Sequence, residues 1–487
     1  MELTGSDSSM NSSKKLTACF FLCFCISIYL PAQQSPTSTQ PQPAQSQEQK
    51  ISPKEAEDLF HDIDNILQFA SKDTGLPIKH EVKKQLSTRD QVVAYLEKNM
   101  SEDKDAQRLK RSELVLKKFG LLPHDFDLQK FLVTLLREQV AGYYDPKTKT
   151  VNLLDWIGAD QQRPVMAHEL THALQDQSFG LEKWMKAGDT DIDDIKQPKS
   201  SDLERDEVAE ARQAVVEGQA MVVLVDYMLD ATGQSILESP QIADALKQSM
   251  LLGTDDSPAF KNAPIFLKEE LTFPYRYGLD FEINLLKDKG KERAFAGVFA
   301  NPPTTSRQIM EPATYLSGEH IDPVNLPDFN EDFKNYERFD MGAMGEFDVA
   351  ILVDQYAGTE ISHEVYPHWR GGYYYSALPK SDKSAPLALL YFSRWSDPDA
   401  AEEFAAIYAR SLEQRYQRVE QTIDNPNSKI PQLKTLKTIN GTHTWQTEDG
   451  AVVISVQRDK VLVTESFDQA TTDRLRQELL DQKLPTK

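Results

Sequence analysis

Apolar residues recur every three or four positions in two segments near the start of the chain. This spacing places them on one face of a helix. The two sets are Leu59, Ile63, Ile66, Leu67 and Ala70, and then Leu128, Phe131, Leu132, Leu135 and Leu136. A charged stretch lies between them at 101–113 (SEDKDAQRLKRSE) and is expected to be solvated. The pattern predicts that residues 51–139 are mainly helical.

The pattern changes to strand-forming residues at 140–154 (VAGYYDPKTKTVNLL). Asp145 and Pro146 are the residue types preferred at the first two positions of a type I turn. The residues on both sides of this turn are rich in strand formers. The segment therefore predicts a β-hairpin.

Helical spacing of apolar residues returns at about 162–253. An acidic interruption at 189–207 predicts a surface loop. The helical region is expected to reach about residue 321. From about 340 the composition favours strands, at 373–377, 387–395, 436–446, 451–457 and 461–467. Hairpin turns are expected at 440–441, 448–450 and 458–460. Helices are expected at 397–417 and 468–480. We expect an aromatic segment at 368–376 (HWRGGYYYS) to be a bulged strand.

Together these patterns predict an α+β fold. A mainly helical domain is expected at 51–335, with a helical N-terminal part at 51–139 and a small edge hairpin. A C-terminal α+β domain with an antiparallel sheet is expected at 340–487.

The N-terminus carries an apolar run at 16–30 (LTACFFLCFCISIYL), which follows Lys14 and Lys15. The run is short for a membrane span, so it predicts a secretory signal peptide at 1–32, with an uncleaved N-terminal anchor as the alternative. Residues 33–50 contain no large apolar residue and predict a disordered linker. All three cysteines lie in the apolar run, so no thiolate metal ligand remains after cleavage. We expect a secreted or periplasmic protein.

The formal net charge of the 487-residue chain is −22. Nucleic acids and anionic membranes bind basic surfaces, so neither is an expected partner apart from the N-terminal segment. An acidic surface keeps an exported protein soluble. The charge identifies no substrate, and the sequence does not specify an oligomeric state.

The motif H-E-x-x-H occurs at 168–172 (HELTH). Two histidines four positions apart share one face of a helix and can bind one metal ion. Glu169 lies about 100° further around the helix, beside the metal, where it can accept a proton from a zinc-bound water. The motif predicts a Zn²⁺ site with His168 and His172 as ligands and Glu169 as the catalytic base.

The residues around the motif predict the helix that it needs. Pro164 suits the first turn of a helix, and Gly180 suits its end. Apolar residues between 165 and 174 supply a face that can be buried.

A catalytic zinc site needs a third protein ligand. Position 178, where the longer motif H-E-x-x-H-x-x-G-x-x-H has its third histidine, is Ser178. A helix expected at 202–231 offers Glu204, Glu207, Glu210 and Glu217. Most of these lie in a polar run that is typical of a solvated face, but Glu217 lies among apolar residues, where a lone acid is costly unless it is paired or metal-bound. We expect Glu217 to be the third ligand, with Glu210 as the open alternative. Without a metal, a buried ion pair with Arg212 would explain why Glu217 lies among apolar residues.

The segment HELTHALQDQ followed by VVEGQA resembles the gluzincin branch of the zincin metallopeptidases. The wider pattern is similar to a family of exported bacterial proteins with this site, through GYYDPKTKTVNLL, HELTHALQDQ, AVVEGQA, FPYRYG and PPTTSRQIMEP, over roughly residues 115–325. The resemblance implies a zincin-like fold, with His168, His172 and Glu217 as zinc ligands and Glu169 as the base. It also implies that the 140–154 hairpin is the edge strand along which an extended substrate binds by β-augmentation.

One position departs from that resemblance. Many gluzincins carry an acid four residues after the glutamate ligand, which orients the first histidine, and here this position is Met221. Asp176, four residues after His172, is a candidate for a different supporting hydrogen bond. The transition-state oxyanion needs a hydrogen-bond donor. Tyr275 and Tyr277 are the candidates for it, with Tyr143 and Tyr144 as others and His320 as a weaker one.

The sequence therefore predicts an exported zinc metallopeptidase that hydrolyses a peptide or protein substrate. The alternative is a catalytically inactive zincin-fold binding or scaffold protein of the cell envelope, for which Met221 is the main support. A zinc hydrolase for a non-peptide amide is not separated from these by the sequence.

Overall fold

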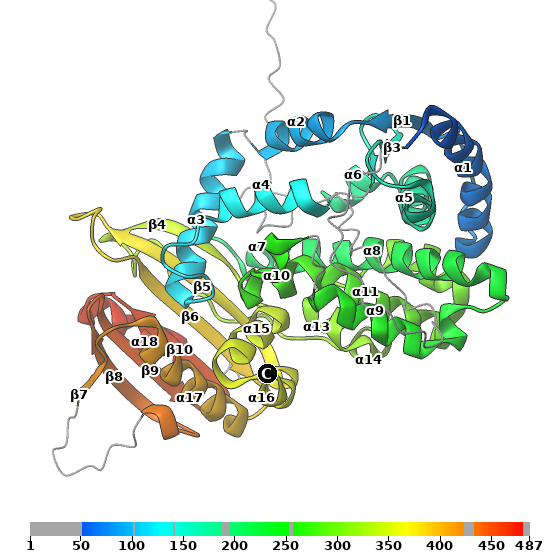
Figure 1. Cartoon of the computed structure of the whole chain (residues 1–487). Coiled ribbons are helices and arrows are strands. Elements are labelled where there is room, and N and C mark those ends of the chain that lie inside the picture. The colour runs from blue at the N-terminus through cyan, green and yellow to red at the C-terminus, as the bar shows by residue number, and fades with distance from the viewer. Residues whose placement is uncertain are drawn as a thin grey trace, which may run out of the picture.

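The structure is a computed structural model that describes residues 51–100, 103–139, 142–186, 195–252, 257–422 and 433–480. Helices dominate the chain before about residue 330, and an antiparallel sheet with covering helices follows (Figure 1). This confirms a mixed α and β fold with an antiparallel sheet in its C-terminal part. The expected signal peptide at 1–32 and linker at 33–50 lie outside the described residues. None of the helices within the described ranges is long and apolar enough to cross a bilayer.

The N-terminal part is helical with one inserted strand. Its elements are α1 (Pro53–Thr74), β1 (Lys83–Ser87), α2 (Arg89–Met100), α3 (Asp103–Phe119) and α4 (Leu128–Gln139). A capping box of Ser52 and Glu55 begins α1, and its predicted apolar face is buried. The charged stretch at 103–113 forms part of α3, because Lys, Arg, Glu and Gln favour helices. From 108 to 113 this stretch is mostly half-buried rather than solvated as expected.

The predicted hairpin is confirmed as β2 (Tyr143–Asp145) and β3 (Thr150–Leu154), which pair antiparallel. The carbonyl of Asp145 accepts a 2.8 Å hydrogen bond from the N–H of Lys149, whose φ is 58°. β1 joins the other side of β3 in parallel, so the order is β1-β3-β2 and β2 is an edge strand. β1 was not predicted, because its five residues alternate too weakly to indicate a strand without their partner.

Helices build the next part of the chain and carry the candidate site. They are α5 (Ala159–Phe179), α6 (Leu181–Met185), α7 (Ser200–Leu203), α8 (Arg205–Leu229), α9 (Pro240–Leu252), α10 (Pro258–Lys261), α11 (Ile265–Lys291), the π-helix η5 (Glu292–Gly297), α12 (Val298–Ala300), α13 (Ser306–Met310) and α14 (Pro312–Ser317). The prediction of a surface loop at 189–207 is wrong from position 200 onward, since α7 and the start of α8 lie there. Residues 189–194 are outside the described ranges.

α8 and α11 pack backbone to backbone. A Cβ on Gly218 would collide with the carbonyl of Gly278, and a Cβ on Gly278 would collide with the carbonyl of Ala214. Glycine at both positions therefore lets the two helices approach closely.

The C-terminal part is a seven-stranded antiparallel sheet with the order β4-β5-β6-β10-β9-β8-β7. Its strands are β4 (Tyr336–Ala343), β5 (Trp369–Pro379), β6 (Ala388–Trp395), β7 (Glu420–Thr422), β8 (Gly441–Thr447), β9 (Gly450–Gln457) and β10 (Lys460–Glu465). The bulged aromatic strand at 368–376 is confirmed, since the register of β5 and β6 shifts between Trp369 and Gly372. The hairpin turn expected at 440–441 is wrong, because β8 begins there after an irregular segment. β4 and β7 were not predicted.

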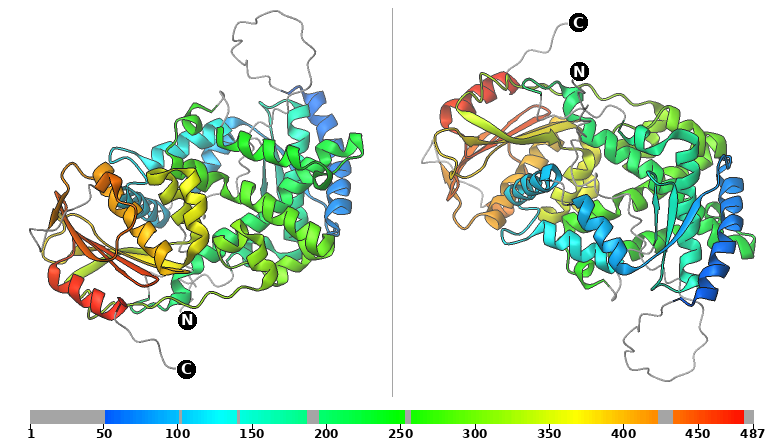
Figure 2. Two further views of the ribbon diagram at one scale, coloured as in Figure 1. Left: turned by 90° about the horizontal axis from the view of Figure 1, so that it is seen from below. Right: turned by 90° about the horizontal axis from the view of Figure 1, so that it is seen from above.

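Helices cover both faces of this sheet: α15 (Glu346–Ala357), α16 (Thr359–Val365), α17 (Pro398–Arg415) and α18 (Gln469–Leu480). Figure 2 shows α17 and α18 on opposite faces. Alternate residues of β6 follow this division, since Leu389 and Tyr391 join the core with α17, whereas Leu390 and Phe392 join the core with α18. The core on the α17 side is continuous with the core of the helical part.

Candidate metal centre

The helix α5 places His168, Glu169 and His172 inside the protein. They are 0%, 1% and 5% exposed. The helix ends at Gly180, whose φ of 68° is left-handed, as predicted. It begins five residues before Pro164, so the placement of Pro164 in the first turn is wrong.

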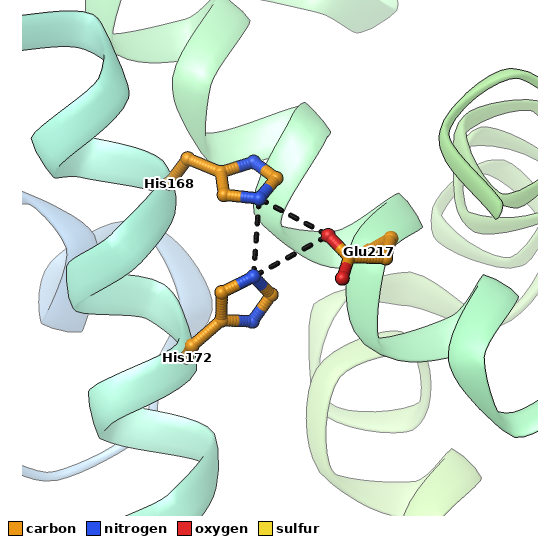
Figure 3. A group of neighbouring side chains, drawn as sticks. All are labelled: His168, His172 and Glu217. Carbon is orange, nitrogen blue, oxygen red and sulfur yellow. Dashed lines mark hydrogen bonds and ion pairs between the residues drawn. The ribbon is translucent and has the colours of Figure 1, made fainter. Parts of the chain in front are cut away.

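The helix α8 brings Glu217 to the two histidines (Figure 3). The Oε2 atom of Glu217 lies 3.1 Å from Nε2 of His168 and 3.4 Å from Nε2 of His172. The two Nε2 atoms are 3.0 Å apart. Figure 3 shows both rings projecting from successive turns of α5 toward the carboxylate, so three donor atoms converge on one point.

The donor set fits a zinc ion. Tetrahedral zinc with bonds of about 2.0–2.1 Å has neighbouring ligand atoms roughly 3.3 Å apart, close to the three distances found here. Two imidazoles and one carboxylate are a ligand set of catalytic zinc sites and leave a fourth position for water or substrate. Within the described ranges this is the one group of at least three such side chains close enough to share an ion.

Charge complementarity holds the group together. Burial disfavours the charged form of His172, but the Glu217 carboxylate outweighs burial and raises the pKa of His172 to about 9. Burial alone would raise the pKa of Glu217, but His172 and His168 outweigh it and lower this pKa to about 2. Without a metal, Glu217 is therefore ionised and pairs with a protonated His172.

The other glutamates of α8 do not join this group. Glu207 and Glu210 are buried, so the expectation of a solvated face is wrong for both. Glu207 accepts hydrogen bonds from the backbone N–H and the hydroxyl of Ser306 at 2.9 and 2.8 Å. Arg212 donates to the carbonyl of Trp184, whereas the ion pairs of Glu217 are with the histidines.

The hairpin holds Glu169 beside the histidines. The Oε2 atom of Glu169 accepts a 2.8 Å hydrogen bond from the N–H of Tyr144 in β2. Its Oε1 atom is buried and has no hydrogen-bond partner in the described part of the chain. One oxygen of Glu169 is thus fixed by the protein, while the other makes no hydrogen bond to the described residues. This contact could not be predicted from the residue types, because every residue except proline has the same backbone N–H donor.

Supporting contacts to the histidines differ from those expected. Asp176 accepts hydrogen bonds from the Tyr144 hydroxyl, the Lys149 ammonium and the Leu181 N–H, not from His172. Instead, Nδ1 of His172 lies 2.9 Å from Oε1 of Gln175. His172 and Gln175 are three positions apart on a helix, a spacing that brings two side chains together, so this contact could have been predicted from the sequence.

Among the described residues, His168 has no hydrogen bond to its Nδ1 atom like the one that Gln175 makes to His172. The Nδ1 atom of His168 is buried and makes no hydrogen bond to any residue that the structure describes. Met221, at the position where an acid could have supported it, is buried and offers only a weakly accepting thioether.

Only one of the two principal tyrosine candidates lies at the site. Tyr275 stacks on His168, with ring centroids 6.2 Å apart and an interplanar angle of 26°. Tyr277 instead contacts Phe273 and Phe347, because two positions along a helix turn a side chain to the other face.

Tyr144 and His320, two of the other donor candidates, contact acidic residues instead of the two histidines. The Tyr144 hydroxyl donates to Asp176 at 2.8 Å. His320 is exposed and lies 3.9 Å from Asp322. Tyr143 is buried on β2, next to the residue that binds Glu169 through its backbone.

Comparisons with protein-family models, with curated proteins and with solved structures found no match to this chain.

Proposed function

We propose that this protein is a zinc-dependent metallopeptidase whose metal ligands are His168, His172 and Glu217. The observation that carries the proposal is the convergence of their donor atoms within 3.0–3.4 Å of one another, with Glu169 beside them. A purely structural ion pair would need neither the second imidazole nor the adjacent glutamate.

Zinc, when bound, supplies a Lewis acid that polarises a carbonyl and lowers the pKa of water to about 7. Glu169 is then the general base, since its free Oε1 can accept a proton while Tyr144 holds its Oε2. Tyr275 lies on the face of His168 and is our candidate donor to the oxyanion.

We infer a zincin-like arrangement for residues 51–335, of the gluzincin type. It is supported by the motif helix α5, the later ligand helix α8 and the edge strand β2, whose backbone reaches Glu169. An extended peptide would pair with β2 by β-augmentation. Because the N–H of Tyr144 is already bound to Glu169 and the neighbours of Tyr144 in β2 face β3, the carbonyl of Tyr144 is the backbone group of β2 that would pair with the substrate.

The test compares wild type with Glu169→Gln and His168→Ala in a peptide-library cleavage assay, with zinc content measured in parallel. We expect Glu169→Gln to retain zinc and to lose about 10²–10⁴-fold in rate, as is usual for a general base. His168→Ala should lose the zinc itself. Equal cleavage by Glu169→Gln and wild type would refute the mechanism.

A second candidate is a binding or scaffold protein that retains the metal site without catalysis. The unsupported Nδ1 of His168 and the neighbouring Met221 favour it, because a loosely held ligand suits turnover poorly. Zinc-loaded wild type that cleaves no member of the library would favour this candidate, or a hydrolase for a non-peptide amide.

We further propose that the protein is exported, on the basis of the apolar run at 16–30. Fractionation of the producing cell should place the full-length chain outside the cytoplasm. Deletion of residues 1–32 should retain it inside.

A further inference from the structure

Two glutamines connect the candidate metal centre to a distant carbonyl of the fold. The amide nitrogen of Gln175 donates to the carbonyl of Val216 at 3.1 Å and to Oε1 of Gln219 at 2.8 Å. The amide nitrogen of Gln219 in turn donates to the carbonyl of Ala294 at 2.9 Å. Gln175 and Gln219 are both fully buried, and we call them the glutamine relay.

The relay has only one consistent direction. Backbone carbonyls can only accept hydrogen bonds, so the carbonyls of Val216 and Ala294 fix which end of each amide carries the nitrogen. Reversing Gln175 would set its oxygen against Val216, and reversing Gln219 would set its oxygen against Ala294. Each buried clash would cost about 1–3 kcal/mol. Oε1 of Gln175 must therefore face His172.

The orientation of the Gln175 amide determines which ring nitrogen of His172 carries a proton. Because Oε1 of Gln175 can only accept, Nδ1 of His172 must carry a proton. The lone pair of the neutral ring is then on Nε2, the atom that faces Glu217 and His168. His168 has no such acceptor on its Nδ1 among the described residues.

The far end of the relay is the π-helix η5, which follows α11. The carbonyls of Ala294 and Phe295 there accept from the amide nitrogen of Gln219, at 2.9 and 3.4 Å. π-helices disturb the regular backbone ladder and occur often at functional sites. This segment thus provides the fixed acceptor that sets the polarity of the whole relay.

We propose that Gln175 and Gln219 are positioning residues that hold His172 in the Nδ1–H tautomer, so that His172 is the preorganised metal ligand and His168 the adaptable one. The inference rests on the zinc site of the proposed function but not on hydrolysis. It therefore predicts metal affinity and ring protonation, which can be measured whether or not the protein cleaves a peptide.

The decisive test is a pair of variants, Gln175→Met and Gln175→Glu, measured for zinc affinity by chelator competition. Both replace the amide that binds Gln219, but only Glu keeps an oxygen acceptor for His172. We expect Gln175→Met to lose about 10–100-fold in affinity, the usual loss when a partner of a metal ligand is removed. Gln175→Glu should lower the stability of the fold, because its second oxygen faces the carbonyl of Val216 and Oε1 of Gln219, but its zinc affinity should stay within a few-fold of wild type. Equal losses in both variants would overturn the proposal.

Gln162→Met is the matched control. Gln162 is another fully buried glutamine of α5, and it bonds the backbone of Leu154 and Ile157, away from the metal site. Its replacement should lower the unfolding temperature and leave zinc affinity unchanged. A loss equal to that of Gln175→Met would show that the effect is general destabilisation, which contradicts a positioning role.

A measurement on wild type makes the proposal independent of how the variants fold. Histidine ¹⁵N spectra of the metal-free protein, at a pH where the ring is neutral, should show His172 protonated at Nδ1, because no metal on Nε2 then dictates the tautomer. Its signal is assigned by its shift in Gln175→Glu. A His172 ring protonated at Nε2 would overturn the relay. Zinc binding with the expected tautomer but without cleavage would refute only the proposed function, whereas wild type that binds no zinc would refute both.

Discussion

Two buried carboxylates in this molecule face opposite situations. Glu465, on β10, is enclosed by Arg415 of α17 at 2.7 Å, by Lys118 of α3 at 3.9 Å and by the hydroxyls of Tyr408 and Tyr416 at 2.7 Å. Among the described residues, the partners of Glu217 are two imidazoles. Both oxygens of Glu465 are bonded, although Nε and Nη1 of Arg415 have no partner in the described ranges. Beside Glu217, the Nδ1 of His168 and the Oε1 of Glu169 have none there either.

The comparison separates a structural cluster from a candidate metal centre. The nearest charged partner of Glu465 is Arg415, and an arginine does not lose its proton in a protein. The partners of Glu465 also join α3 to the C-terminal sheet, which makes the cluster a tie between distant parts of the chain. A histidine can release its proton, so the partners of Glu217 can exchange that proton for a metal ion.

The largest expected effect is on zinc affinity. Glu217→Gln should lower it on the order of 10³-fold, because a site worth about 10–16 kcal/mol in total loses one of a few ligands. Glu465→Gln should leave it unchanged. Competition with a fluorescent chelator measures the zinc affinity of both variants. A similar loss of affinity in the two would mean that Glu217 is no more a metal ligand than Glu465 is.

For the stability of the metal-free protein, the substitution of Glu465 should have the larger effect and that of Glu217 the smaller one. Glu465→Gln should lower the free energy of unfolding by about 3–5 kcal/mol, because it leaves Arg415 buried without its counter-charge. Glu217→Gln should cost about 1 kcal/mol, since His172 can become neutral. Urea denaturation after chelation checks this difference. Equal losses would mean that both clusters are structural.

Zinc should stabilise wild type and Glu465→Gln alike. At free zinc 100-fold above the dissociation constant, binding to the native state alone adds about 2.7 kcal/mol. Glu217→Gln should show no such gain. Thermal unfolding with and without zinc provides the measurement, and a gain in Glu217→Gln would place the metal elsewhere.

The smallest expected effect, taken per pH unit, is the pH dependence of zinc binding. The pKa of His172 is raised to about 9, so zinc must displace a proton below that pH. Affinity should therefore rise about tenfold per pH unit up to about pH 9 and then level off. In the metal-free protein the same raised pKa gives stability that is fully present below pH 6.5 and is lost as pH rises through about 9. A zinc affinity that is flat between about pH 6 and 8 would contradict the ion pair.

Parts of the fold with strong local periodicity were predictable. The face of α1 from Leu59 to Ala70 was, because helical spacing is written into neighbouring residues. β1 was not, because its strand character depends on β3, more than sixty residues away. The burial of Glu207 also escaped prediction, since the Ser306 that satisfies it comes from another helix.

For the candidate site, the helical repeat of H-E-x-x-H was enough to place two imidazoles on one helix face with Glu169 one position along. That Glu217 rather than Glu210 meets them, that Tyr275 rather than Tyr277 stacks there, and that Gln175 supports His172 became clear from the packing of the helices. These choices depend on how α5, α8 and α11 pack, and close packing at Gly218 and Gly278 is a property of two surfaces in contact, which neither segment specifies alone.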